Sequence, residues 1–226
     1  MEVINKLKKL YNFSSPITEL VCGTLDYSIF KNDGDIRFCN SASLLSHIPT
    51  GSDKRISAFH SFVNSDPYFW MLPLKTAKDS IYGFVLKSYT RKQYRNVFCN
   101  SNISAFYGWK EFGDFKTNYP IILTEGVKDC IVLKKLYPFS LACLTAGLHG
   151  LKDYEIIRSL TDKVVLAYDN DSAGRVATEK NFKKLQEFGI KVQKAYYPTG
   201  DIGELHNNLI GQEVLRNSLK QAFQNF

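Results

Sequence analysis

The sequence predicts an α/β fold in which a parallel four-stranded sheet, covered by helices, follows a smaller α+β subdomain rich in basic residues. Between residues 120 and 195, short apolar runs alternate with segments of helical periodicity, which is typical of βαβ units. Residues 70–89 instead have the pattern of a hairpin, and many Lys and Arg side chains lie between residues 75 and 95. Acidic residues follow three of the four apolar runs, at the end of a sheet where ligands usually bind.

The length and composition allow more than one domain. With 226 residues, 44% of them hydrophobic, the chain can bury one large or two small cores. We expect a basic N-terminal subdomain over residues 1–118, the α/β domain over 119–210 and a C-terminal helix over 211–226. The predicted strands are 121–124, 141–145, 164–168 and 191–197, and the predicted helices between them are 127–136, 153–160 and 172–188.

The first 70 residues carry weaker signals. Residues 2–11 (EVINKLKKLY) have the spacing of an amphipathic helix with lysines on its polar face, which predicts a surface helix. The pair Asp33-Gly34 is a turn signal between two short apolar segments, and a loop is expected around residues 49–53. A strand, a turn at 78–80 and a second strand are expected over residues 70–89.

Basic and aromatic residues are interleaved from residue 75 onward. Cations that contact phosphates, with rings that stack on bases, form the kind of surface that binds single-stranded nucleic acid. A solvated sheet edge whose lysines prevent aggregation is the alternative interpretation. The basic residues are Lys75, Lys78, Lys87, Arg91, Lys92 and Arg95, and the aromatic ones are Tyr82, Tyr89, Tyr94 and Phe98.

The charge and cysteine content narrow the class of protein. A net charge of +7 favours an anionic partner. No run of about 18 apolar residues and no signal peptide is present, so we expect no membrane contact and a cytoplasmic location. The cysteines form no C-x-x-C pair and no zinc spacing with histidine, so we expect reduced thiols and no structural zinc.

The segment VVLAYDNDSAG, residues 164–174, is the centre of the candidate site. Asp169 and Asp171 directly follow a buried strand, and a turn of small residues then begins a helix. Two carboxylates at this spacing can hold one hard cation such as Mg²⁺ beside a phosphate. A solvated turn without metal is the alternative, because Asp and Asn are common in turns.

Other acids are expected at the same edge of the sheet. Glu125 ends the first predicted strand and Asp129 follows about one helical turn later, while Asp201 and Glu204 follow the fourth strand. Because the carboxyl ends of parallel strands meet at one edge, these acids should face those at 169 and 171. Stabilisation of a helix N-terminus by Glu125 is the alternative.

These residues carry a resemblance to a known family. The ordered set Glu125-Gly126-x-x-Asp129, Asp169-x-Asp171-x-Ala173-Gly174 and Gly200-Asp201 resembles the TOPRIM domain of bacterial-type primases, topoisomerases and some nucleases. Residues 73–87 and the segment Phe98-Cys99-Asn100-Ser101 are similar to elements that precede TOPRIM in bacterial-type primases. The resemblance is therefore to the DnaG-like catalytic core of bacterial and phage primases.

The sequence departs from the primase pattern at several positions. Asn170 stands between the paired acids where the family has Gly, and Gly203 stands where the family has a further acid, for which Glu204 is a possible substitute. The lysine that the family places before the second upstream element falls near Val97, with Arg95 close by. The sequence shows no zinc-ribbon cysteine set and no helicase-binding domain. We therefore expect a zinc-bearing partner to supply template recognition, and a replicative helicase to be a second partner.

The resemblance implies RNA primer synthesis on single-stranded DNA from ribonucleoside triphosphates, with two Mg²⁺ or Mn²⁺ ions. A TOPRIM nuclease, or a non-catalytic nucleic-acid-binding adaptor of the replication machinery, are the alternatives. The catalytic residues implied are Glu125, Asp169 and Asp171, and the metal ligands are those three together with Asp129 and Asp201. The expected contacts to nucleic acid or nucleotide are Lys87, Arg91, Lys92, Arg95 and Arg175.

Overall fold

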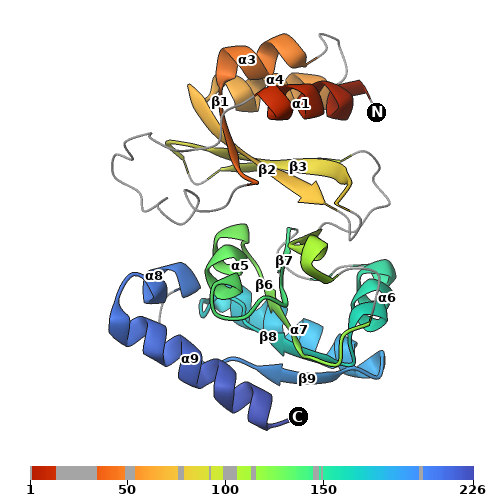
Figure 1. Cartoon of the computed structure of the whole chain (residues 1–226), viewed down its shortest axis with the longest axis vertical. Helices are drawn as coiled ribbons and strands as arrows, with labels where there is room; N and C mark the ends of the chain where they lie inside the picture. Colours follow the sequence, from red (N-terminus) through yellow and green to blue (C-terminus); the bar gives the residue numbers. More distant parts are fainter. Residues whose placement is uncertain are drawn as a thin grey trace. The chain divides into compact units, whose positions relative to one another are not determined.

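The computed structural model divides the chain into two compact units, Met1–Ile103 and Ser104–Phe226, which are drawn in Figure 1. The boundary therefore differs from the one expected at residue 118, because strand β5 (Phe106–Tyr107) pairs with β7 (Ser140–Cys143) of the second unit. The structure describes residues 2–13, 35–48, 54–75, 79–91, 93–98, 106–112, 116–144, 148, 150–198 and 201–226.

The first unit contains an antiparallel sheet in the order β1-β2-β3-β4. The hairpin expected over residues 70–89 is confirmed by the pairing of β2 with β3, while the turn signal at Asp33-Gly34 lies outside the described residues. Trp70 and Lys87 are paired across this hairpin and so lie on the same face of the sheet. The strands are β1 (Arg37–Asn40), β2 (Tyr68–Lys75), β3 (Ile81–Ser88) and β4 (Tyr94–Phe98).

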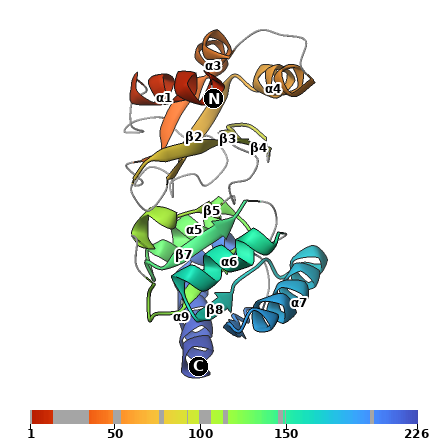
Figure 2. The same cartoon turned by 90° about the vertical axis from the view of Figure 1, so that its right-hand side faces the viewer.

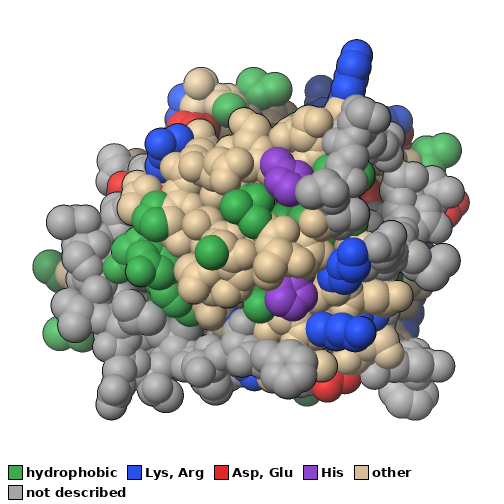
Figure 3. All heavy atoms as spheres, turned by 90° about the horizontal axis from the view of Figure 1, so that it is seen from above, with side chains coloured by type: hydrophobic (Ala, Val, Ile, Leu, Met, Phe, Trp, Pro, Cys, Tyr) green, Lys and Arg blue, Asp and Glu red, His purple; other side chains and the backbone are tan. Residues whose placement is uncertain are grey.

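Among the described residues of this unit, three helices cover the other face of the sheet: α1 (Glu2–Phe13), α3 (Ser41–His47) and α4 (Lys54–Asn64). The segment expected as an amphipathic helix is α1, and its apolar side is buried at Ile4 and Leu7 against Phe84 of β3 and its neighbours. Hydrophobic and uncharged side chains lie between scattered Lys and Arg on the outer side of these helices (Figure 3).

The second unit contains a five-stranded sheet in the order β5-β7-β6-β8-β9. The prediction of four strands is wrong by one: β6, β7, β8 and β9 are parallel as expected, but β5 adds an antiparallel edge strand. Two residues are too few to produce a periodic signal, so β5 could not be recognised from the sequence. The remaining strands are β6 (Ile121–Thr124), β8 (Lys163–Leu166) and β9 (Lys191–Lys194), and a short 3-10 helix covers Trp109–Phe112.

Helices cover both faces of this sheet. Helices α6 (Leu151–Leu160) and α7 (Ser172–Glu187) share one core with the sheet, and α5 (Val127–Lys134) and α9 (Leu209–Gln224) pack on the opposite side (Figure 2). The helices that follow the neighbouring strands β6 and β8 therefore lie on opposite faces. Such a topological switch point is where parallel sheets bind their ligands.

Among the described residues, no helix is both long enough and apolar enough to cross a membrane.

The short helix α8 (Ile202–His206) joins the end of β9 to α9, and it packs against both α5 and α9. This packing brings the segment that begins at Asp201 back to the carboxyl end of the sheet, beside the helix that follows β6.

Candidate functional site

The switch point between β6 and β8 holds the acids that the sequence singled out. Glu125 directly follows β6, and the backbone N–H of Asp169, beyond the end of β8, donates to Oε2 of Glu125 at 3.4 Å. The two strands are hydrogen-bonded neighbours, with Leu123 opposite Leu166. The structure therefore places these two carboxylates together, as predicted from their positions at the same edge of a parallel sheet.

Asp171 and Asp201 each cap a helix with one oxygen. Oδ1 of Asp171 accepts from the N–H of Gly174 at 2.7 Å, and Oδ1 of Asp201 accepts from the N–H of Glu204 at 2.6 Å. The alternative interpretation of the D-x-D segment, as a turn, thus applies to Asp171, which is the N-cap residue of α7 (Ser172–Glu187). A cap engages one oxygen of a carboxylate, so the second oxygen of each aspartate takes no part in its cap.

The carboxylate of Asp169 is half-buried beside the other acids. Its Oδ1 is buried and accepts no hydrogen bond, and a buried carboxylate oxygen without a partner is costly unless a cation compensates it. No group of three His, Cys, Asp or Glu side chains among the described residues is arranged to hold a metal ion. Mg²⁺ is commonly held by one or two carboxylates with water and substrate phosphates, so the residues present fit such an ion.

Asp129, on the first turn of α5, lies behind the other acids and is 6% exposed. Its Oδ1 accepts from the N–H of Gly203 at 3.2 Å. A Cβ at Gly126 would stand 2.6 Å from Oδ2 of Asp129, which is closer than real Cβ atoms come. The spacing E-G-x-x-D therefore has a steric cause: the glycine leaves room for the aspartate carboxylate.

The carboxylates raise one another's pKa. Burial, followed by the charges of Asp169 and Asp201, raises the pKa of Asp129 to about 7. Burial and then the charge of Asp169 raise the pKa of Glu125, and burial and then the charge of Asp201 raise that of Asp169. Mutual repulsion of this kind is relieved by a bound cation, and it is a common feature of functional sites.

Asn170, which lies between the paired acids, holds the loop after β8 in place through hydrogen bonds. Nδ2 of Asn170 donates to the carbonyl oxygens of Tyr197 at 2.9 Å and Pro198 at 3.3 Å, which ties this loop to the segment before Asp201. Nη1 of Arg175 donates to the backbone oxygen of Asn170 at 2.9 Å. Arg175, a predicted phosphate contact, therefore holds the loop in this structure.

Gly174 allows the loop and the helix to approach closely. A Cβ at this position would stand 2.1 Å from the backbone oxygen of Asp169, so only glycine fits at the start of α7 without displacing the acid. The glycine that ends the motif D-x-D-x-A-G is thus required by the close approach of the backbone of Asp169.

The basic residues of the first unit differ in their exposure. Lys87 is 2% exposed, and its Nζ donates to the backbone oxygens of Ser88 at 2.7 Å and of Arg91. The expectation that Lys87 contacts nucleic acid conflicts with this burial, because its ammonium is engaged by the turn that follows β3. Arg91 is exposed and Arg95 is partly buried, whereas Lys92 lies outside the described residues.

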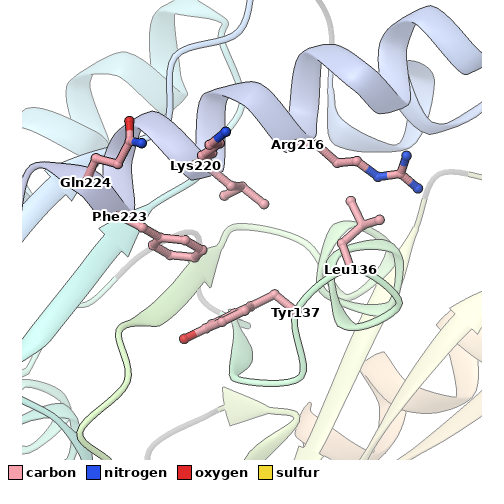
Figure 4. Close-up of a pocket in the computed structure, with 7 residues that line it drawn as sticks. Leu136, Tyr137, Arg216, Lys220, Phe223 and Gln224 are labelled. Atoms are coloured by element: carbon pink, nitrogen blue, oxygen red, sulfur yellow. The ribbon is translucent and has the colours of Figure 1, made fainter.

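Two hollows of the second unit differ in their relation to the acids. One of about 330 Å³ lies between α9 and the segment after α5, where Phe223 faces Tyr137 with ring centroids 4.9 Å apart (Figure 4). Its lining includes Arg216 and Lys220 but no acid. A smaller one of about 160 Å³ is lined by Asp169 and Asn170, among others. Only the second adjoins the carboxylates.

Sequence reasoning missed two residues beside the acids. Tyr197 is buried and its hydroxyl donates to the backbone oxygen of Tyr168, just before Asp169. Lys128 precedes Asp129 on α5 and opposes the rise of the pKa of Asp169, which burial and the charge of Asp201 cause. Lys128 stands at one of the x positions of the motif E-G-x-x-D, which the motif does not specify. Its place directly before Asp129 was the only sign in the sequence that it could lie near the acids.

This chain contains a Toprim domain: residues 122–206 match the family described as Toprim-like. It is 32% identical to a DNA primase of Clostridium acetobutylicum over 104 residues, which are 46% of this chain and 16% of that protein. The fold as a whole is that of the DnaG-type primase catalytic cores. It matches the zinc-binding and RNA polymerase domains of the Aquifex aeolicus primase with a TM-score of 0.70 and 19% identity, covering 98% of this chain and 61% of that one.

A further solved structure extends the comparison. The DnaG primase catalytic domain bound to single-stranded DNA matches with a TM-score of 0.68 and 18% identity, over 98% of this chain and 81% of that one. The predicted TOPRIM fold is thus confirmed, and the predicted likeness to primase catalytic cores is confirmed at the level of the fold. This chain spans about a sixth of the length of the Clostridium relative.

Proposed function

We propose that this protein is a DNA primase catalytic core, which synthesises short RNA primers on a single-stranded DNA template. The observation that carries the proposal is the buried, unpartnered Oδ1 of Asp169 within a group of mutually repelling carboxylates. That group lies at the switch point of a Toprim domain in a chain with the fold of primase catalytic cores.

Primer synthesis joins two ribonucleotides. The 3′ hydroxyl oxygen of one attacks the α-phosphorus of the next, the bond to pyrophosphate breaks, and the hydroxyl proton leaves. We assign this proton to Glu125, because a carboxylate whose pKa is raised by burial and by Asp169 is a stronger base than an exposed one. The backbone N–H of Asp169 holds Glu125 at the edge of the site.

The resemblance to primases implies that Asp169, Asp171 and Asp201 would hold Mg²⁺ or Mn²⁺, with Asp129 behind them. When bound, such ions neutralise the charge of the transferring phosphate and lower the pKa of the attacking hydroxyl. The resemblance to primases implies two ions. The caps made by Asp171 and Asp201 fix the directions of their remaining oxygens, since each side chain is tied to the start of a helix.

The template and nucleotide contacts are assigned to the basic residues. Arg91 and Arg95 of the first unit, together with Lys92, are the proposed contacts to single-stranded DNA; a related core has been solved bound to single-stranded DNA. Lys87 acts indirectly, by fixing the turn that carries Arg91. A replicative helicase and a zinc-bearing protein are the proposed partners, and the cytoplasm is the proposed location.

The test is primer synthesis by the purified protein with single-stranded DNA, labelled ribonucleotides and Mg²⁺ or Mn²⁺. We expect short oligoribonucleotides from the wild type and none from Asp169→Ala. Metal-dependent cleavage of nucleic acid without incorporation would identify a nuclease instead. Binding of single-stranded DNA that is independent of metal, with no turnover, would identify a non-catalytic adaptor.

A further inference from the structure

Lys128 occupies the space that a side chain at residue 203 would need. A Cβ built on Gly203 would stand 2.5 Å from both Cε and Nζ of Lys128. Lys128 comes from the first turn of α5 and Gly203 from the first turn of α8, two helices that pack together. The lysine side chain thus reaches across to the backbone of α8, and glycine at 203 makes this reach possible.

The ammonium of Lys128 lies near two of the carboxylates, Asp129 and Asp201. Nζ of Lys128 and Oδ1 of Asp201 both lie within 3.1 Å of the point where a Cβ of residue 203 would stand. The N–H of Gly203 donates to Oδ1 of Asp129, so this second carboxylate adjoins the same point. Burial and neighbouring acids raise the pKa of Asp129, and the charge of Lys128 opposes that rise.

A fixed positive charge at this place changes which ions the site can hold. A divalent cation beside Asp201 would meet the ammonium within a few ångströms, and like charges at such distances repel strongly in a partly buried site. Glycine at 203 also offers no carboxylate to a cation there. Asp169 keeps a buried carboxylate oxygen without a hydrogen-bond partner, so one divalent cation can still be held there.

We propose that the ammonium of Lys128 is the resident cation on the Asp201 side of the site, so that this chain binds one divalent ion where the resemblance implies two. The same ammonium binds phosphate oxygens of the incoming ribonucleoside triphosphate. This second part rests on the proposed primase function, whereas the ion count does not. An ammonium carries three donors, which suits a phosphate with several acceptor oxygens.

The ion count is tested by titrating the metal-free protein with Mn²⁺, using calorimetry and the electron paramagnetic resonance signal of free Mn²⁺. We expect one ion for the wild type and for Lys128→Arg, which keeps the charge. The double variant Lys128→Ala with Gly203→Asp removes the ammonium, relieves the steric conflict and adds a carboxylate, and should bind two. Lys135→Met removes an exposed lysine beyond the end of the same helix and should bind one.

The phosphate contact is tested with the same proteins. Lys128→Met should raise the KM for ribonucleotides by about 10- to 100-fold, the loss expected for one hydrogen bond to a charged group, while Lys135→Met leaves it unchanged. Thermal unfolding of each variant identifies any that does not fold, and Lys128→Gln then replaces Lys128→Met.

The outcomes separate the two proposals. Two Mn²⁺ ions in the wild type, or an unchanged count in the folded double variant, would refute the role of Lys128 as resident cation, whatever the enzymatic activity. An unchanged KM in Lys128→Met would refute the phosphate contact. One Mn²⁺ ion in a wild type that makes no primers would refute the primase proposal and leave the ion count standing.

Discussion

The N–H of Asp169 donates to Oε2 of Glu125 at 3.4 Å, and this bond joins the ends of two neighbouring parallel strands. A neutral amide orients the Glu125 carboxylate but does not cancel its charge. The pKa of Glu125 remains raised, first by burial and then by the charge of Asp169. The hydrogen bond thus fixes the positions of the two residues, but their negative charges remain uncompensated. A bound cation would compensate them.

The first prediction concerns the stabilising effect of metal. Mg²⁺ at 100 times its dissociation constant should raise the free energy of unfolding of the wild type by about 2.7 kcal/mol. Asp169→Asn should abolish this increase, because it removes the charge of the carboxylate whose Oδ1 lacks a partner. Thermal unfolding with and without Mg²⁺ measures both.

The control for this prediction is Asp162→Asn. Asp162 is exposed and pairs with Lys116 at 2.6 Å, at the start of β8 and so at the opposite end of the sheet. The stabilisation by Mg²⁺ should persist in this variant. An Asp169→Asn protein that Mg²⁺ still stabilises fully would show that the ion binds elsewhere.

The second prediction concerns Gly174. Gly174→Ala should lower the free energy of unfolding by about 1–3 kcal/mol, the usual cost of forcing an extra methyl group into a packed site. The added Cβ would stand 2.1 Å from the backbone oxygen of Asp169, so Mg²⁺ binding should weaken as well. Gly150→Ala is the matched control, since its nearest atom would be 4.0 Å away. Equal unfolding midpoints in urea for the two variants would contradict the proposed close approach.

The third prediction is a pH dependence that disappears with metal. The pKa of Asp129 is raised from its ordinary value of 3.8 to about 7, so the folded protein binds more protons than the unfolded chain between these pH values. Without metal, stability should therefore fall as pH rises from about 4 to about 7, by at most about 4 kcal/mol at 1.36 kcal/mol per pH unit.

Asp129→Asn tests this origin of the pH dependence. The variant should be more stable than the wild type at pH 8 in the presence of a chelator, and its unfolding temperature should change less between pH 5 and pH 8. The raised pKa values of Glu125 and Asp169, caused first by burial, act in the same direction and leave part of the slope. A metal-free wild type whose stability rises over this range would contradict the assignment.

The parts of the fold that could be predicted are those with long or repeated signals. The alternation of apolar runs and helical segments predicted β6 to β9 and their helices, and the acids after β6, β8 and β9 had to meet because parallel strands share one carboxyl edge. Strand β5 was missed because two residues, Phe106 and Tyr107, have no periodicity and are fixed by pairing with β7.

The parts of the site that could not be predicted depend on side-chain reach. Nothing in the sequence indicates that Lys128 extends to Gly203, since the two are far apart along the chain and meet only through the packing of α5 on α8. Lys87 was assigned to a binding surface from its charge and neighbours. Its burial follows from hydrogen bonds to Ser88 and Arg91, which composition does not encode.

The fourth prediction separates the basic residues of the first unit. Arg91→Ala should weaken binding of single-stranded DNA and reduce the slope of log K against log salt by about 0.7, the value for removing one cation from a phosphate. Lys87→Met should mainly lower stability, because Lys87 is 2% exposed and its ammonium is bonded within the turn. Filter binding across a salt series measures the slopes. If Lys87→Met instead reduced the slope as much as Arg91→Ala does, with unchanged stability, Lys87 would belong to the binding surface.

The fifth prediction concerns the buried carboxylate that orders this turn. Oδ2 of Asp66 accepts from the N–H of Thr90 at 2.7 Å and from the hydroxyls of Thr90 and Ser88. Burial acts to raise the pKa of Asp66, but these hydrogen bonds outweigh it and leave that pKa below its ordinary value of 3.8. The resulting stability is therefore present at neutral pH and is lost as pH falls below about 4.

Asp66→Asn should cost about 2–3 kcal/mol at pH 7, because an amide nitrogen would face donors where a carboxylate accepted from them. The loss should shrink as pH falls below about 4, because the wild-type carboxylate loses its charge as pH passes through its lowered pKa. Asp35→Asn is the matched control in the same unit: its ion pair with Lys75 at 2.8 Å is partly exposed, and such pairs contribute at most about 1 kcal/mol. Urea unfolding at pH 7 and at about pH 3, below the ordinary pKa of aspartate, measures both variants. Equal losses at pH 7 would mean that Asp66 does not order the turn between β3 and β4.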